Sequence, residues 1–145
     1  MGTQGSDRFL RVTHVFGTSV YAMWVSTPER ARYARRPFRM TLTEIQELAS
    51  LAGSAWGRLP LPAIQSETLP SGSEKEQYLE VAWSLLQPLI EAFDKESNLS
   101  RNRFASLISA RAHATDSHVN TLRRMLLRYY YFGRTRLALL PLVPA

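Results

Sequence analysis

One amphipathic stretch near the C-terminus constrains the fold of this chain most strongly, because it joins helical periodicity to a helix-stopping glycine. Five apolar side chains recur there at helical spacing: Leu122, Met125, Leu126, Tyr129 and Tyr130. Residues spaced i, i+3, i+4, i+7 and i+8 share one face of an α-helix. Gly133 follows and tolerates the left-handed conformation that ends many helices. The sequence therefore predicts a helix that begins near His118, buries one stripe and stops at Gly133.

The other side of this predicted helix is polar in its first turns. On a helical wheel, Asn120, Arg124, Leu127 and Tyr131 lie opposite the stripe, with Arg123 and Arg128 on its flanks. A stripe docked on its own domain, with polar groups facing outward, is what a DNA-recognition helix needs. We expect base readout by residues of the first turns: His118, Asn120, Thr121 and Arg124.

The residue types in these turns suit base edges. An asparagine amide such as that of Asn120 pairs with adenine, and the guanidinium of Arg124 pairs with guanine N7 and O6. Thr121 is expected on a phosphate or a thymine methyl. Tyr131 points away from the stripe and is expected to reach DNA, and Leu127 is expected to make an apolar contact on the outer face.

Charge is distributed unevenly along the chain. The net charge is +6. The segment from Ser97 to the last residue contains eight arginines and a single acidic residue, Asp116. Guanidinium groups match phosphate geometry, so this basic end favours a polyanionic partner, although a solvated basic face is the alternative. Phosphate contacts are expected from six arginines: Arg101, Arg103, Arg123, Arg128, Arg134 and Arg136.

Two more helices are predicted upstream. A capping box of Ser73 and Glu76 opens a helix to about Phe93, with Pro88 inside it as a kink or weakened turn. Its inner face is expected to hold Tyr78 or Leu79, and then Ala82, Leu85, Leu86, Leu89, Ile90 and Phe93. The next helix is capped by Ser100 and ends near Ala112, with Phe104, Leu107 and Ile108 inside. Residues 113–117 form the turn, and Asp116 or Ser117 is expected to cap the recognition helix.

The N-terminal half looks β-rich. Residues 7–25 predict a hairpin around Gly17 and Thr18, and Pro37 restricts a third strand within residues 28–40 to a sheet edge. A capping box of Thr41 and Glu44 starts a short helix to about Leu51, which Gly53 ends. Its inward residues are expected to be Leu42, Ile45, Leu48 and Ala49. Residues 57–64 should be extended, because they contain two prolines.

The expected fold class is α+β: a small β-rich N-terminal domain with one helix, then an all-α, three-helix, homeodomain-like helix-turn-helix domain. The expected boundaries are 1–66 for the first domain, 67–73 for a linker that lets the halves tilt, and 74–136 for the second. Four arginines of the first domain are candidates for secondary DNA contacts: Arg32, Arg35, Arg36 and Arg39. They could equally be the wet face of an edge strand that charge protects from aggregation.

Several classes of function lack support in the sequence. There is no cysteine, and the three histidines are scattered without carboxylates at ligand spacing, so no metal or cofactor is expected. No Ser/His/acid grouping or Gly-rich phosphate loop is readable, and the chain is expected to be non-catalytic. It has no apolar run of about 18 residues and no signal-peptide pattern, which favours a cytoplasmic protein.

The sequence of residues 121–141 resembles that of the second DNA-binding domain of TnsB-like transposases, which are DDE-type relatives of Mu transposase. The matching residues are Thr121, Leu122, Met125, Leu126, Leu127, Arg128, Tyr129, Tyr130, Gly133, Thr135, Ala138, Leu139, Leu140 and Pro141. The departures are Leu127 where the family usually has Arg, Tyr130 for Trp, His118 for Ser or Thr, and no acid after Pro141. The β-rich segment before the helices also matches the family's order.

This resemblance implies binding of double-stranded DNA at transposon-end repeats in a bacterial, nucleoid-associated setting. It implies an endonuclease subunit and an AAA+ ATPase regulator as partners. Residues 137–145 would begin the linker to a separate catalytic core, where Mg²⁺ would be held by an acidic triad. A stand-alone helix-turn-helix transcriptional regulator is the alternative, and an interaction module whose β-rich half binds proteins is a third hypothesis. RNA binding is less favoured, since neither a stacking sheet nor a GXXG loop is present.

Overall fold

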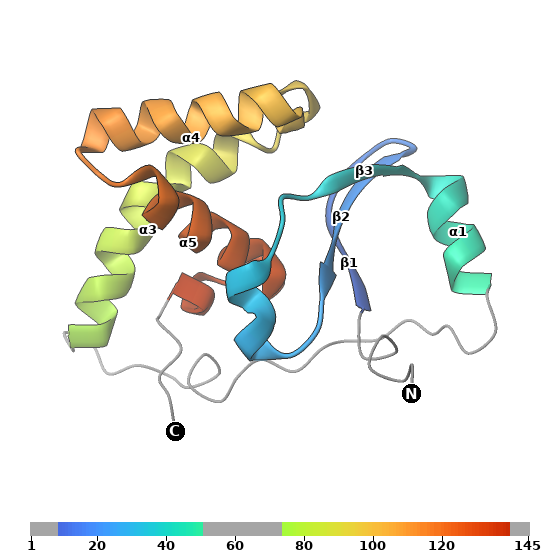
Figure 1. Ribbon diagram of the computed structural model, residues 1–145, viewed down its shortest axis with the longest axis horizontal. Helices are drawn as coiled ribbons and strands as arrows, with labels where there is room; N and C mark the ends of the chain where they lie inside the picture. Colours follow the sequence, from blue (N-terminus) through green and yellow to red (C-terminus); the bar gives the residue numbers. More distant parts are fainter. Residues whose placement is uncertain (1–8, 51–73, 140–145) are drawn as a thin grey trace.

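The computed structural model describes residues 9–50 and 74–139, and it has an α+β fold (Figure 1). A three-stranded antiparallel sheet comes first and helices follow. The N-terminal elements are β1 (Phe9–Phe16), β2 (Ser19–Val25), the 3-10 helix η2 (Pro28–Tyr33), β3 (Phe38–Thr41) and α1 (Leu42–Ser50). The C-terminal elements are α3 (Glu74–Ala92), the 3-10 helix η3 (Glu96–Leu99), α4 (Arg101–Thr115), α5 (Val119–Tyr131) and the 3-10 helix η4 (Arg136–Leu139).

The predicted hairpin is confirmed. β1 and β2 pair antiparallel around a turn in which Gly17 has a φ of 62°, a conformation that glycine adopts at little cost. β3 pairs with the other side of β2 and lies at the sheet edge, starting directly after Pro37. The third strand predicted within residues 28–40 is β3, which begins at Phe38, and residues 28–33 before it form the 3-10 helix η2.

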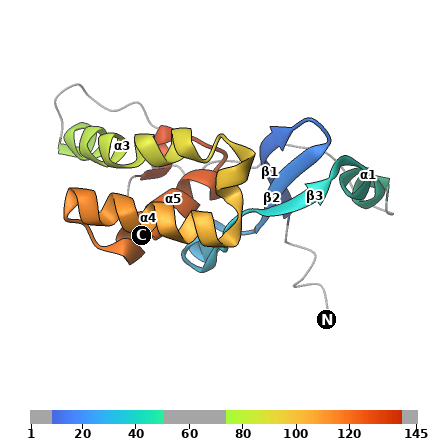
Figure 2. The ribbon, with the colours of Figure 1, turned by 90° about the horizontal axis from the view of Figure 1, so that it is seen from above.

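The central strand β2 is buried on both faces, which explains its nearly continuous apolar sequence. Tyr21, Met23 and Val25 face the helices, whereas Val20 and Ala22 join a second cluster. That second cluster is completed by Met40 and Ile45, with Leu10, Phe38 and Leu48 packed against it. In Figures 1 and 2 the sheet accordingly lies between α1 and the helical half.

The capping box of α1 is confirmed. The Thr41 backbone N–H donates to Glu44 Oε1 over 3.0 Å, and the Glu44 N–H donates to Thr41 Oγ1 over 3.1 Å. These bonds hold the pKa of the Glu44 carboxyl below its usual value. The periodicity predicts Leu42 inside, but this prediction is wrong, since its exposed fraction is 44%.

Some predictions fall outside the described residues. They concern the side chain of Ala49, the end of α1 at Leu51 and Gly53, the extended segment 57–64, the linker and the Ser73 cap. The domain boundaries therefore remain predictions.

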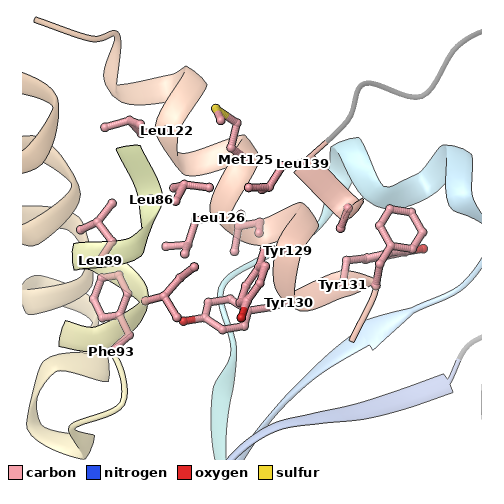
Figure 3. Packing of buried hydrophobic residues seen from close by; sticks show 14 of the residues in the cluster. Leu86, Leu89, Phe93, Leu122, Met125, Leu126, Tyr129, Tyr130, Tyr131 and Leu139 are labelled. Carbon is pink, nitrogen blue, oxygen red and sulfur yellow. The ribbon is translucent and has the colours of Figure 1, made fainter. Parts of the chain in front are cut away.

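The three C-terminal helices enclose one apolar cluster (Figure 3). Of the two alternatives near the start of α3, Leu79 is buried and Tyr78 is 42% exposed. The rest of the predicted stripe faces inward, although Leu85 is only partly buried. Phe93 and Phe104 stack with ring centroids 4.7 Å apart and so join α3 to the first turn of α4.

Pro88 lies inside α3, as expected, and α4 compensates for it. Proline has no N–H, so the carbonyl of Ser84, four residues earlier, loses its helical donor. Arg111 of α4 supplies a replacement, since its Nη2 donates to Ser84 O over 3.1 Å and its Nε to Leu85 O over 2.9 Å. Arg111 thus replaces the hydrogen bond that Pro88 removes from α3, and it links α3 to α4.

The turn between α4 and α5 is shorter than predicted. α4 continues to Thr115, three residues past the expected end at Ala112, and leaves only Asp116–His118 between the helices. Asp116 has a φ of 53°, and the Ser117 N–H donates to Ala112 O over 2.8 Å. Asp116 therefore takes the left-handed position that glycine usually occupies in such a helix end. The predicted capping of α5 by Asp116 or Ser117 is wrong, because His118 is the N-cap.

Candidate nucleic-acid interface

Helix α5 is covered unevenly along its length. It lies between α3 and α4 on one side and η2 on the other (Figure 1). The predicted stripe is buried, with Leu122, Leu126 and Tyr130 showing no exposed surface. After Arg124, the side opposite the stripe is buried as well, so only the first two turns present a polar surface to solvent.

Two predictions for the far side of α5 are wrong. The helical wheel turns Leu127 and Tyr131 outward, but each is 3% exposed and belongs to the core. In Figure 3, Tyr131 points away from Tyr129 and Tyr130, toward the N-terminal half. Its hydroxyl accepts from the Ser26 N–H over 2.7 Å and donates to Thr27 O over 2.6 Å. The N-terminal half thus covers a second side of α5. The linker composition predicts that the two halves tilt relative to each other, whereas in the structure they share buried contacts.

The four residues predicted for base readout lie together on the exposed start of α5. His118, Asn120, Thr121 and Arg124 are all exposed. His118 Nδ1 accepts from the Asn120 N–H over 3.2 Å, which satisfies one of the free donors at the helix start. Arg124 Nε donates to Asn120 O over 3.3 Å, so its guanidinium extends along the first turn.

The six arginines predicted for phosphate contacts fall into two groups. Arg101, Arg103, Arg123 and Arg136 are exposed. Arg103 donates to Asn98 Oδ1 over 3.0 Å, and Arg136 lies over the Trp83 ring with its Cζ 5.6 Å from the centroid.

Arg128 and Arg134 are engaged inside the molecule. Arg128 donates to Ala138 O and Leu139 O, both over 2.7 Å, and burial lowers the pKa of its guanidinium. Arg134 forms an ion pair with Asp94 over 3.0 Å and donates to Thr13 O over 3.2 Å. Both guanidinium groups therefore make hydrogen bonds within the protein. The structure gives no support to the phosphate contacts predicted for these two arginines.

The four arginines predicted to make secondary DNA contacts also lie in two different places. Arg32, Arg35 and Arg36 line an open pocket of about 470 Å³ whose lining includes Arg123 of α5. Arg39 lies elsewhere, with its Nη2 3.0 Å from Ser19 Oγ and its Nε 3.7 Å from Glu96 Oε2. The sequence did not predict that Arg123 and the N-terminal arginines line one pocket. The only local signal was the density of arginine between residues 30 and 39.

Within residues 9–50 and 74–139, no group of three or more His, Cys, Asp or Glu side chains is placed to hold a metal ion. No helix in these two ranges is long and apolar enough to cross a membrane.

A scan against protein-family models identifies the helical half. Residues 79–142 match the TnsB second domain. The match runs from the second turn of α3 through α4, α5 and η4, and it confirms the resemblance to TnsB-like transposases in this part of the chain. The TnsB second domain is a DNA-binding unit and not a catalytic one, and the match shows no catalytic domain in this chain. No curated protein matches the chain.

Proposed function

We propose that this chain binds double-stranded DNA sequence-specifically at transposon ends, as the DNA-binding part of a TnsB-like transposase. The observation that supports this most strongly is the exposed start of α5 within a TnsB second domain. Asn120 and Arg124 project there from a helix that is otherwise buried. Helices α4 and α5, joined by a tight turn at Asp116, would act as the helix-turn-helix.

In this proposal the start of α5 enters the major groove. Arg124 donates to guanine O6 and N7, Asn120 pairs with adenine, and Thr121 lies against a phosphate or a thymine methyl. The exposed Nε2 of His118 adds one more polar group at the helix start. Arg101 and Arg103, in the first turn of α4, are suited to phosphates flanking the bases, because backbone contacts set the register of a protein on the duplex.

A selection from a randomised duplex library identifies the preferred site and tests specificity in one experiment. The selected duplex should bind about 10³-fold or more tightly than a shuffled one at physiological salt. Arg124→Ala should cost about 1–3 kcal/mol and relax the preference at one base position, whereas Arg101→Ala should weaken binding to all sequences alike. Equal affinity for selected and shuffled duplexes would remove the claim of specific binding.

The remaining parts of the proposal rest on the resemblance. Strand joining, its Mg²⁺, and the endonuclease and AAA+ ATPase partners would belong to the complete transposition complex. Enrichment of transposon-end sequences among the selected duplexes would favour the transposase over a stand-alone transcriptional regulator. Enrichment of promoter-like sites alone would favour the regulator.

A further inference from the structure

The pocket between the two halves is lined by four arginines. Arg32, Arg35 and Arg36 come from η2 and the segment after it, and Arg123 comes from the exposed start of α5. The other described residues that line the pocket are Tyr33 and Ala34. Arg123 directly precedes Arg124, so the pocket lies beside the residues proposed to read bases.

These positive charges are not neutralised by the protein. No carboxylate lines the pocket among the described residues, and none of its four arginines has an ion pair there. Arg39 and Arg134 differ, since each lies within 4.0 Å of a described acid. Four arginines around one pocket make it positively charged, and a phosphate with several acceptor oxygens matches guanidinium donors.

The pocket is formed in advance, because η2 is fixed onto α5. The Tyr131 hydroxyl bonds to both Ser26 and Thr27, directly before η2. Ala31 of η2 is buried in the shared core, and Pro37 after the arginine segment is fully buried. Binding an anion here therefore requires little ordering of the backbone, which keeps the entropy cost low.

We propose that Arg32, Arg35, Arg36 and Arg123 together bind one backbone phosphate of the duplex that α5 reads. Tyr131 is a positioning residue for this site. The inference rests on the proposed function and deepens it, because it makes the two halves act on one phosphate instead of on separate stretches of DNA. It also excludes Arg39 from the contact, although Arg39 belongs to the same arginine-rich segment.

A double-mutant cycle on duplex binding tests the shared phosphate, with fluorescence anisotropy on the selected duplex at several salt concentrations. Arg35→Ala and Arg123→Ala should each weaken binding about 5- to 10-fold, and the double variant clearly less than the product of the two. The slope of log K against log[salt] should become shallower by no more than about 1 in the double variant, because one phosphate is involved, whereas two separate phosphates would give about 2. Multiplicative losses with the larger slope change would overturn the proposal.

Arg39→Ala is the matched control, because it removes the same charge from the same segment outside the pocket. Its effect should be small and should multiply with that of Arg123→Ala. A coupling between Arg39 and Arg123 as large as that between Arg35 and Arg123 would show a general charge effect and contradict the shared site.

Tyr131→Phe keeps the ring and removes the two hydroxyl bonds. It should weaken DNA binding about as much as Arg35→Ala and abolish the coupling between Arg35 and Arg123, while the base preference set by Arg124 stays unchanged. Retention of the full coupling in Tyr131→Phe would overturn the positioning role. If circular dichroism shows that this variant is unfolded, the arginine cycle alone decides the proposal.

Titration with inorganic phosphate separates a DNA phosphate from a free one. Tight phosphate binding that Arg35→Ala abolishes, combined with unchanged duplex binding in the pocket variants, would identify a free-anion site and overturn the inference. Specific, Arg124-dependent duplex binding that the pocket variants leave intact would also overturn it, yet leave the proposed function standing. Absence of any duplex binding by the wild-type chain would refute both.

Discussion

Replacing Arg111 by methionine tests whether α4 repairs the proline break in α3. The change keeps most of the side-chain volume and removes the donors to Ser84 O and Leu85 O. Hydrogen bonds from a charged donor contribute about 1.5–3 kcal/mol when buried, and these are partly exposed. We therefore expect the free energy of unfolding to fall by about 1–2 kcal/mol.

The Pro88→Ala background makes the explanation testable. Alanine restores an N–H that donates to the Ser84 carbonyl, so Arg111 is no longer its only donor. Arg111→Met should then cost about 1 kcal/mol less than in the wild-type background. Pro88→Ala by itself should stabilise the chain, because alanine is the better helix former.

Urea unfolding followed by circular dichroism measures all four corners of this cycle. Arg101→Met is the matched control, since it removes the same charge from an exposed position on the same helix and should change stability by about 0.5 kcal/mol or less. Equal costs of Arg111→Met in the proline and alanine backgrounds would refute the repair.

Three further predictions concern single residues. Asp116→Gly should raise the free energy of unfolding by about 0.5–1 kcal/mol, since it relieves a left-handed residue, while Asp116→Asn should leave it nearly unchanged; a gain from both would implicate charge instead. Burial lowers the pKa of His14 from 6.5 to about 4, so the unfolded chain binds the proton more readily and stability should fall as the pH drops through this window, by about 3 kcal/mol at most. Chemical unfolding between pH 7 and 4 should show this loss in the wild type and not in His14→Phe; parallel profiles would contradict it. Gly133→Ala should lower the melting temperature, at a cost of about 1–2 kcal/mol, because φ is 88° and a Cβ would lie 2.7 Å from Arg11 Nη1; an unchanged melting temperature would refute this.

Features encoded by neighbouring residues were predictable. The Thr41–Glu44 capping box, the turn at Gly17 and the stop at Gly133 each depend on a few adjacent positions. At the helix stop, the Arg134 N–H donates to Tyr129 O over 2.8 Å and the Gly133 N–H to Tyr130 O over 3.1 Å, which are the bonds expected of a left-handed terminus. Such features depend on local chemistry and not on tertiary contacts.

Features that depend on distant partners were not predictable. A helical wheel assigns Tyr131 to the solvent side because it describes one helix alone, whereas the Tyr131 hydroxyl bonds to residues more than 100 positions earlier in the chain. The pocket shared by Arg123 and Arg35 was not predictable for a similar reason, since these residues lie 88 positions apart in the sequence. The end of α4 was misplaced for a local reason, since Asp116 tolerates a conformation for which glycine is the usual signal.

Under the proposed function, the burial of the second half of α5 limits how many base pairs this helix can contact. Its exposed start, residues 119–124, rises by about 9 Å at 1.5 Å per residue. Base pairs are stacked about 3.4 Å apart, so this length reaches roughly three of them. A binding site with a longer consensus must therefore obtain its remaining positions from DNA shape, from the N-terminal half or from a second copy of the chain.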